Sequence, residues 1–342
     1  MQTGKIQTVR GDISPDELGI TMTHEHLRMP PKHFWPWVAG KDGKRQQDGL
    51  AFLIETTSRF AESGGKTLVD VTASHHQPDP GTLRQLSEAT GLNIVVSTGF
   101  YKEPLYPPFV LDWGVDDFKD FFVKELTEGA GDSGIKAGII GEIGTFRNRV
   151  NPREEKVFRA AARAHLCTGA PISTHATLGT MGLAQLDILE DEGVDLSRVV
   201  IGHQDLRSDL DTHEAIMKRG AYVQYDTIGK ERYDYVIQEN RGRWEAGPDL
   251  RVEYLAERHY RKDDDRLACL VELIDRGYAD QIMLSQDMSA REACLNPNTH
   301  GEWGYAYLLE SFVPRLREAG VSEDAIRMML VENPSKFLRF TL

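Results

Sequence analysis

The sequence predicts an α/β fold, namely a (β/α)₈ TIM barrel with a short β-hairpin at its N-terminus. Short runs rich in β-branched and apolar residues recur eight times along the chain, and segments with helical spacing separate them. Several runs are almost continuously apolar, as expected for strands that a parallel sheet buries on both faces. The length of 342 residues suits eight such units in a single domain, 1–342. A doubly wound open sheet is the alternative that these observations leave open.

The strands are predicted in a regular order after the hairpin, which is expected around Gly11–Pro15 because both residues favour turns. Each run is short and apolar, and most end in a polar residue or a glycine. The predicted strands are 19–24, 66–72, 93–99, 137–144, 171–176, 198–203, 221–227 and 281–287.

Helices are predicted between these strands from their end signals. In the segment 151–169, Pro152 suits the first helical position, acidic residues follow it, and Gly169 suits the stop. Similar patterns occupy 180–193, 209–220 and 263–277, and a closing helical piece at 322–338 begins with Ser322 as its cap. The connection 228–262 is unusually long, and long connections in compact domains often act as lids, so we expect an active-site lid here.

Composition excludes several classes of function. The formal net charge of −13 argues against nucleic acid or an anionic membrane as partner. Three scattered cysteines, Cys167, Cys269 and Cys294, form neither a disulfide framework nor a zinc knuckle, which favours a reducing compartment. No signal-peptide core or membrane-length apolar stretch is apparent, so a cytoplasmic protein is expected.

Imidazole and carboxylate groups fall at the ends of the predicted strands, where barrel enzymes place their chemistry. His24 and His26 are two apart, so they point to one face of a strand. The full set is His24, His26, Glu142, His175, His203 and Asp287. Each could be structural by itself, with Asp287 a helix cap or Glu142 a buried acid paired with a cation. Together they suit two divalent metals, zinc first and manganese, cobalt, iron or nickel as alternatives.

Motifs along nearly the whole chain resemble the phosphotriesterase family of the amidohydrolase superfamily. They are TMTHEH, AGIIGEIGT, PISTHATLGTMGLAQLDIL, GVDLSRVVIGHQDL, GAYVQYDTIGK and IMLSQD. The resemblance implies a barrel with a binuclear metal centre. His24, His26 and Asp287 would hold the more buried metal, and His175 and His203 the more exposed one. Many members bridge the metals with a carboxylated lysine, whereas this chain resembles the subgroup in which a glutamate, here Glu142, bridges.

Hydrolysis by a metal-activated water is the predicted chemistry, with Asp287 as catalytic proton acceptor. The glutamate bridge favours a carboxylic ester or lactone. Amide hydrolysis of an N-acyl compound with an anionic tail, phosphotriester hydrolysis, and a metal-bearing barrel that only binds ligands are the alternatives. Tyr101, Lys230 and Arg291 are candidate contacts for a small, anionic substrate, although both cations could equally be solvated loop charges. His75 and His76 are expected in a loop near the site, and family resemblance leaves a homodimer open.

Overall fold

The computed structural model describes residues 4–27, 49–74, 80–103, 105–230, 261–289 and 304–342. Within these residues an eight-stranded sheet runs in strict sequence order from one edge to the other, and every neighbouring pair is parallel. The strands are β3 (Thr21–Glu25), β4 (Thr67–Asp70), β5 (Asn93–Thr98), β6 (Ile139–Thr145), β7 (Ile172–Ala176), β8 (Val199–Ile201), β9 (Tyr222–Tyr225) and β10 (Ile282–Leu284).

The sheet closes on itself at the carboxyl ends of β10 and β3. The amide of Asp287 donates to the carbonyl of His24 at 3.0 Å, and the amide of His26 donates to the carbonyl of Met288 at 2.9 Å. A parallel bridge between His26 and Ser289 continues this pairing. These bonds confirm the predicted (β/α)₈ barrel over the open sheet, because an open sheet would leave its two edge strands unpaired.

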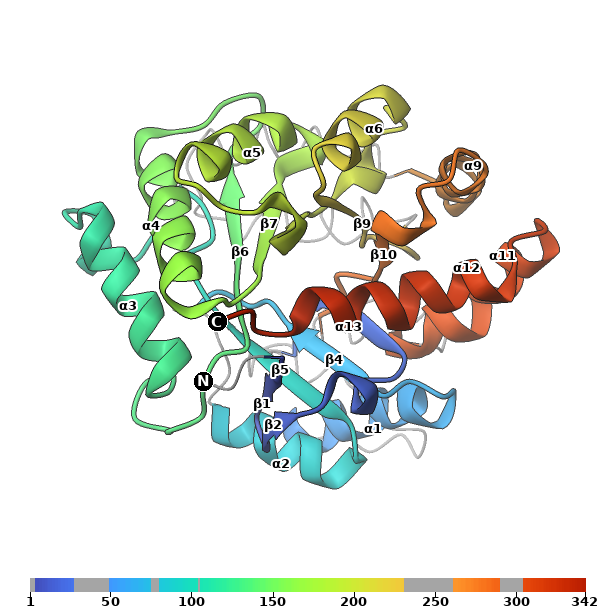
Figure 1. Cartoon of the computed structure of the whole chain (residues 1–342). Coiled ribbons are helices and arrows are strands. Elements are labelled where there is room, and N and C mark those ends of the chain that lie inside the picture. The colour runs from blue at the N-terminus through green and yellow to red at the C-terminus, as the bar shows by residue number, and fades with distance from the viewer. Residues whose placement is uncertain (1–3, 28–48, 75–79, 104, 231–260, 290–303) are drawn as a thin grey trace, which may run out of the picture.

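Helices follow most strands and surround the barrel (Figure 1). They are α1 (Gly49–Glu62), α2 (Pro80–Thr90), α3 (Val115–Thr127), α4 (Pro152–Thr168), α5 (Gly182–Asp191), α6 (Leu210–Lys218) and α9 (Asp263–Asp275). The predicted ends of α4 are confirmed, because Pro152 opens the helix and Gly169 caps it with a φ of 73°. The closing segment contains α11 (Val313–Glu318), α12 (Glu323–Arg327) and α13 (Asn333–Leu338). Ser322 accepts from the amide of Ala325 at 3.2 Å, as a cap should.

The N-terminal hairpin exists but lies earlier than predicted. Strands β1 (Ile6–Thr8) and β2 (Gly11–Ile13) pair antiparallel, so the turn is at 9–10 and not within 11–15. The Thr8 hydroxyl fixes this turn, since it donates to the carbonyl of Gly11 at 2.7 Å and accepts from the amide of Arg10 at 3.2 Å. Pro15 instead opens a short 3₁₀ helix that Glu17 caps through the amide of Ser14.

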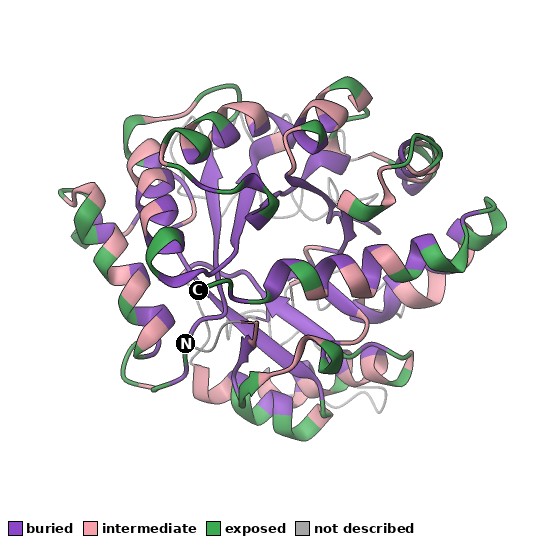
Figure 2. Cartoon of the chain, in the orientation of Figure 1, coloured by how far each residue is buried: buried purple, intermediate pink, exposed green. Residues whose placement is uncertain are grey.

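The burial of side chains follows the layers expected of a barrel. The eight barrel strands are buried throughout, while helices bury only the face toward the strands (Figure 2). One apolar cluster packs strands against helices, and a second fills the end of the barrel where the strands begin. The second cluster joins Ile6 of β1, Val69 of β4, Val95 of β5 and Leu338 of α13. No helix among the described residues combines the length and apolar character needed to cross a membrane.

Candidate metal centre

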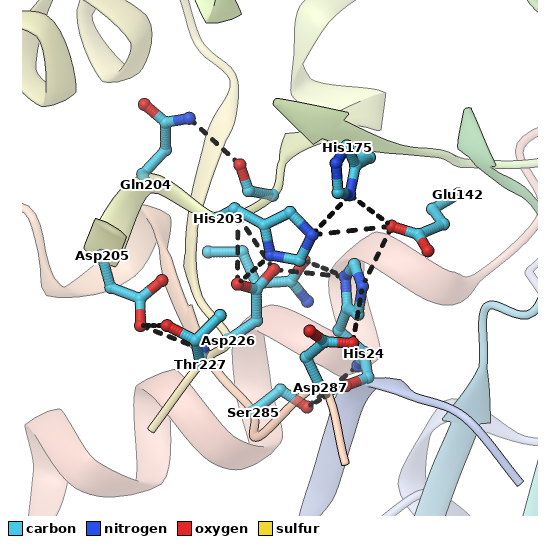
Figure 3. A network of polar contacts seen from close by, with 12 residues as sticks. His24, Glu142, His175, His203, Gln204, Asp205, Asp226, Thr227, Ser285 and Asp287 are labelled. Atoms are coloured by element: carbon cyan, nitrogen blue, oxygen red, sulfur yellow. Dashed lines mark hydrogen bonds and ion pairs between the residues drawn. The ribbon is translucent and has the colours of Figure 1, made fainter. Parts of the chain in front are cut away.

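The six residues predicted at the strand ends converge at one rim of the barrel. Figure 3 shows five of them from close by, namely His24, Glu142, His175, His203 and Asp287. His24 lies on β3 with His26 just beyond it, Glu142 is on β6 and His175 is on β7. His203 and Asp287 follow β8 and β10 in the left-handed region, with φ of 58° and 47°. Because all eight strands are parallel, their carboxyl ends lie at the same rim of the barrel, and this topology brings the six side chains together.

Glu142 occupies the centre of the cluster. Its Oε2 lies 3.3 Å from His24 Nε2, 3.0 Å from His175 Nδ1 and 3.6 Å from His203 Nε2. Its Oε1 lies 3.4 Å from His26 Nε2. Burial alone would raise the pKa of this carboxyl, but the surrounding imidazoles, above all His175, hold the pKa well below its usual value. Glu142 is therefore an anion within reach of all four rings.

Asp287 completes the β3 side of the cluster. Its Oδ1 lies 3.0 Å from His26 Nε2, and its Oδ2 accepts a short bond from the ammonium of Lys230. Burial opposes ionisation, yet the charge of Lys230 and the bond from His26 keep the pKa of Asp287 far below normal. Burial lowers the pKa of His26. The hydrogen bond and the charge of Asp287 oppose this effect, and the pKa is raised to about 9.

His175 presents its two ring nitrogens to different surroundings. Nδ1 faces Glu142 and also His203, whose Nε2 is 2.6 Å away. Nε2 lies 3.0 Å from the hydroxyl of Tyr101, 3.2 Å from Thr177 Oγ1 and 3.4 Å from the ammonium of Lys102. Burial, together with the charges of His203 and Lys102, lowers the pKa of His175 to about 3. A neutral ring with a free Nδ1 lone pair is the form that binds metals.

Asp226 is a buried residue of the site that the sequence analysis passed over. Its carboxylate accepts from His203 Nδ1 at 2.8 Å and from the amide of His203 at 3.0 Å, and it lies 3.2 Å from His24 Nδ1. Gln224 Oε1 is 3.1 Å from the same nitrogen of His24. These contacts turn Nε2 of both rings toward the cluster, a common arrangement behind metal-ligating histidines. The signal was available, because Asp226 lies at the end of the seventh predicted strand, 221–227.

A buried ion-pair network supports the segment that carries Asp226 and Lys230. Arg266 of α9 is fully buried and contacts Asp205 at 2.8 Å and Asp263 at 2.7 Å. Asp205 accepts from the amide and hydroxyl of Thr227, and Asp263 accepts from the amide of Gly229. The chain after β9 is thus fixed on both sides of Ile228, which explains how a loop residue, Lys230, is buried beside Asp287.

The donor set fits divalent metals. His24, His26 and Asp287 form one group of possible ligands and Glu142, His175 and His203 a second, with the ligand atoms of each group within 4.8 Å of one another. His24 Nε2 is buried without a hydrogen-bond partner, although its Nδ1 has two acceptors. Nitrogen and carboxylate ligands of this kind suit zinc and its neighbours in the first transition row. His24, His203 and Asp226 form a third group of possible ligands. In this group Asp226 bonds the two rings and so fixes their orientation.

The structure places two of the three predicted substrate contacts. Tyr101 bonds His175, and Lys230 bonds Asp287, so both border the candidate centre. The alternative that Lys230 is a solvated loop charge is wrong, since only 2% of the residue is exposed. Arg291, His75 and His76 lie outside the described residues, and so does the part 231–260 of the lid predicted at 228–262.

Comparisons with known proteins agree with this geometry. The model of the phosphotriesterase family matches residues 4–338. The phosphotriesterase homology protein of Escherichia coli is 36% identical over 96% of this chain and all of that protein. An N-acetyltaurine hydrolase of Xenopus tropicalis is 30% identical over 99% of both chains. A crystal structure of a lactonase from Listeria monocytogenes covers 99% of this chain and all of its own, with a TM-score of 0.79 and 30% identity. The chain is therefore a metal-dependent hydrolase that belongs to the phosphotriesterase family.

Proposed function

We propose that this hydrolase holds two divalent metals with six residues and cleaves a carboxylic ester or lactone. His24, His26 and Asp287 would hold one metal, His175 and His203 the other, and Glu142 would bridge them. The observation that carries the proposal is the central position of Glu142, whose two oxygens lie within 3.6 Å of ring nitrogens from both groups. A carboxylate in that place needs no modified lysine.

The bound metals would supply a water of lowered pKa and would polarise the substrate carbonyl. Asp287 would accept the proton of the attacking water and pass it to the leaving oxygen. Lys230 would hold one Asp287 oxygen and leave the other toward the cluster. Asp226 would keep His203 and His24 in the tautomers that present Nε2. Tyr101, against His175, would border the space for the acyl group.

The lactonase neighbour supports the ester or lactone class, because its likeness extends over the full length of both chains. A second candidate is the amide bond of an N-acyl compound with an anionic tail. N-acetyltaurine is such a compound, and the relatives named for its hydrolysis are aligned over 99% of this chain. The buried ammonium groups of Lys102 and Lys230, one on each side of the cluster, suit an anionic substrate.

Reconstitution and a substrate panel test the proposal. The full chain is stripped with a chelator and reloaded separately with zinc, manganese, cobalt, iron or nickel, and the metal content is measured. We expect two equivalents per chain and the highest kcat/KM with a lactone or aryl ester. A higher value for N-acetyltaurine or N-acyl amino acids would establish the second candidate, and a higher value for a phosphotriester would contradict both. Two bound metals without turnover of any substrate would contradict the proposed activity.

A further inference from the structure

Glu25 stands between His24 and His26 in the sequence, and its carboxylate points to the opposite side of β3. The residue is fully buried. Oε1 accepts from the Ser285 hydroxyl at 2.7 Å and from the amide of Gln286 at 2.8 Å, and Oε2 accepts from the amide of Met288 at 2.8 Å. All three donors belong to the segment that follows β10, which is about 260 residues away along the chain.

The two amides that Glu25 binds lie immediately on either side of Asp287. Asp287 itself has a φ of 47°, a conformation that side chains other than glycine adopt at a cost. Its own amide donates to the carbonyl of His24 at 3.0 Å. Ser285, while donating to Glu25, accepts from the amide of His24 at 2.9 Å. The amides of residues 286, 287 and 288 thus all donate to His24 or Glu25 at the end of β3, and these bonds fix the strained Asp287.

A carboxylate is required for this arrangement because three donors converge on two oxygens. A glutamine of the same size would turn an NH₂ group toward at least one N–H or O–H donor and would leave that buried donor without an acceptor, which is unfavourable. None of these bonds involves the Glu142 and His175 strands, β6 and β7, which lie across the barrel from the β3–β10 seam.

We propose that Glu25 is a positioning residue that sets Asp287 against His24 and His26, and so determines the affinity of that ligand group for its metal. The inference rests on the proposed function, since it assigns a metal to this group. It deepens that function by separating the two metal positions. The position at His24, His26 and Asp287 depends on Glu25, whereas the position at Glu142, His175 and His203 does not.

Glu25→Gln in the full chain tests the inference, with zinc as the titrated metal. We expect one of the two bound equivalents to weaken about 10- to 100-fold, the usual effect of removing a group that orients a ligand, while the other keeps the wild-type affinity. In the metal-free protein, hydrogen exchange at the amides of Gln286 and Met288 should accelerate. Ser285→Ala keeps the carboxylate but removes one donor, so it should weaken the same equivalent by a smaller factor.

Glu154→Gln is the matched control. Glu154 is also fully buried, and its Oε2 also accepts from two amides, those of Phe146 at 3.2 Å and Asn151 at 2.8 Å. The control should leave both metal affinities unchanged. If Glu25→Gln or Ser285→Ala folds and either keeps both affinities or weakens both equally, the inference is wrong. A wild-type protein that binds no zinc would instead refute the proposed function, and the exchange rates in metal-free protein would still show whether Glu25 fixes the segment.

Discussion

The two ends of the barrel are closed in opposite ways. Where the strands begin, Ile6, Leu338 and neighbouring apolar side chains fill the interior. Arg198, a buried cation at this end, donates through its two terminal nitrogens to the carbonyls of Lys336, Phe337 and Arg339, while its Nε has no hydrogen-bond partner among the described residues. Where the strands end, Glu142 and Asp226 lie buried together with His24, His175 and His203, and the half-buried His26 and Asp287 adjoin them. One end is stable by burial of apolar area, and the other concentrates charge that burial disfavours.

The pKa values of buried histidines differ between the two ends of the barrel. In the last turn of α4, burial lowers the pKa of His165, and the bond of its Nδ1 to the carbonyl of Ala170 does not offset the effect. At the other end the carboxylates overcome burial and raise the pKa of His24, His26 and His203. At the rim the carboxylates therefore favour positive charge, whether protons or metal ions, at three of the four imidazoles, whereas burial prevails at His165. We conclude that the rim is built to bind cations and the opposite end to hold the fold.

The largest expected effect is that of Glu142→Ala. The change removes the carboxylate whose oxygens lie at the centre of the cluster, near rings of both ligand groups, so at least one metal should be lost. We expect kcat/KM on the best substrate to fall by about 10³-fold or more, roughly 4 kcal/mol of transition-state stabilisation. Metal analysis and steady-state kinetics measure it. Retention of two metals per chain would contradict a bridging role.

Asp287→Asn should lower kcat by about 10²- to 10⁴-fold, the range for loss of a positioned proton acceptor, while KM changes much less. The amide is of similar size, but it cannot take a proton at neutral pH, and it loses the charge that pairs with Lys230. Turnover at the wild-type rate would remove Asp287 from the proton-transfer role. Metal content must be measured in parallel, because Asp287 is also a proposed ligand.

Leu338→Ala probes the other end of the barrel. Leu338 is fully buried in the apolar cluster there, so truncation should cost about 2–5 kcal/mol of unfolding free energy. Metal stoichiometry and kcat should remain those of the wild type. Urea unfolding gives the stability, and Leu342→Ala is the control because that side chain is 56% exposed. A loss of metal affinity with Leu338→Ala would show that the two ends are not independent.

The smallest effect is expected from His165→Gln. Because the pKa of His165 is lowered by folding, the unfolded chain binds its proton first, and stability falls as the pH drops below about 6.5. Removing the imidazole should make this decline shallower, by at most about 1.4 kcal/mol per pH unit for one proton. Unfolding free energies between pH 7 and pH 5 measure the slope. An unchanged slope would mean that His165 does not contribute to the pH dependence.

Local patterns in the sequence were sufficient for the strands and for most of the site. Apolar runs located all eight strands, and a rule about strand ends collected His24, His26, Glu142, His175, His203 and Asp287. The same rule applies to Asp226, at the end of the strand predicted at 221–227, but the sequence analysis did not consider this residue. The hairpin was placed too late, because the Thr8 side chain, and not Gly11 or Pro15, fixes the turn.

By itself, the sequence determined the alternation of strands and helices and the kinds of metal ligand, because apolar periodicity and donor type are properties of neighbouring residues. Only the tertiary structure decided that Lys230 is buried against Asp287, that Lys102 borders His175, and that Glu25 holds the segment after β10. These contacts join residues tens to hundreds of positions apart. No local pattern encodes such a pairing, since it depends on how the closed barrel brings its first and last strands together.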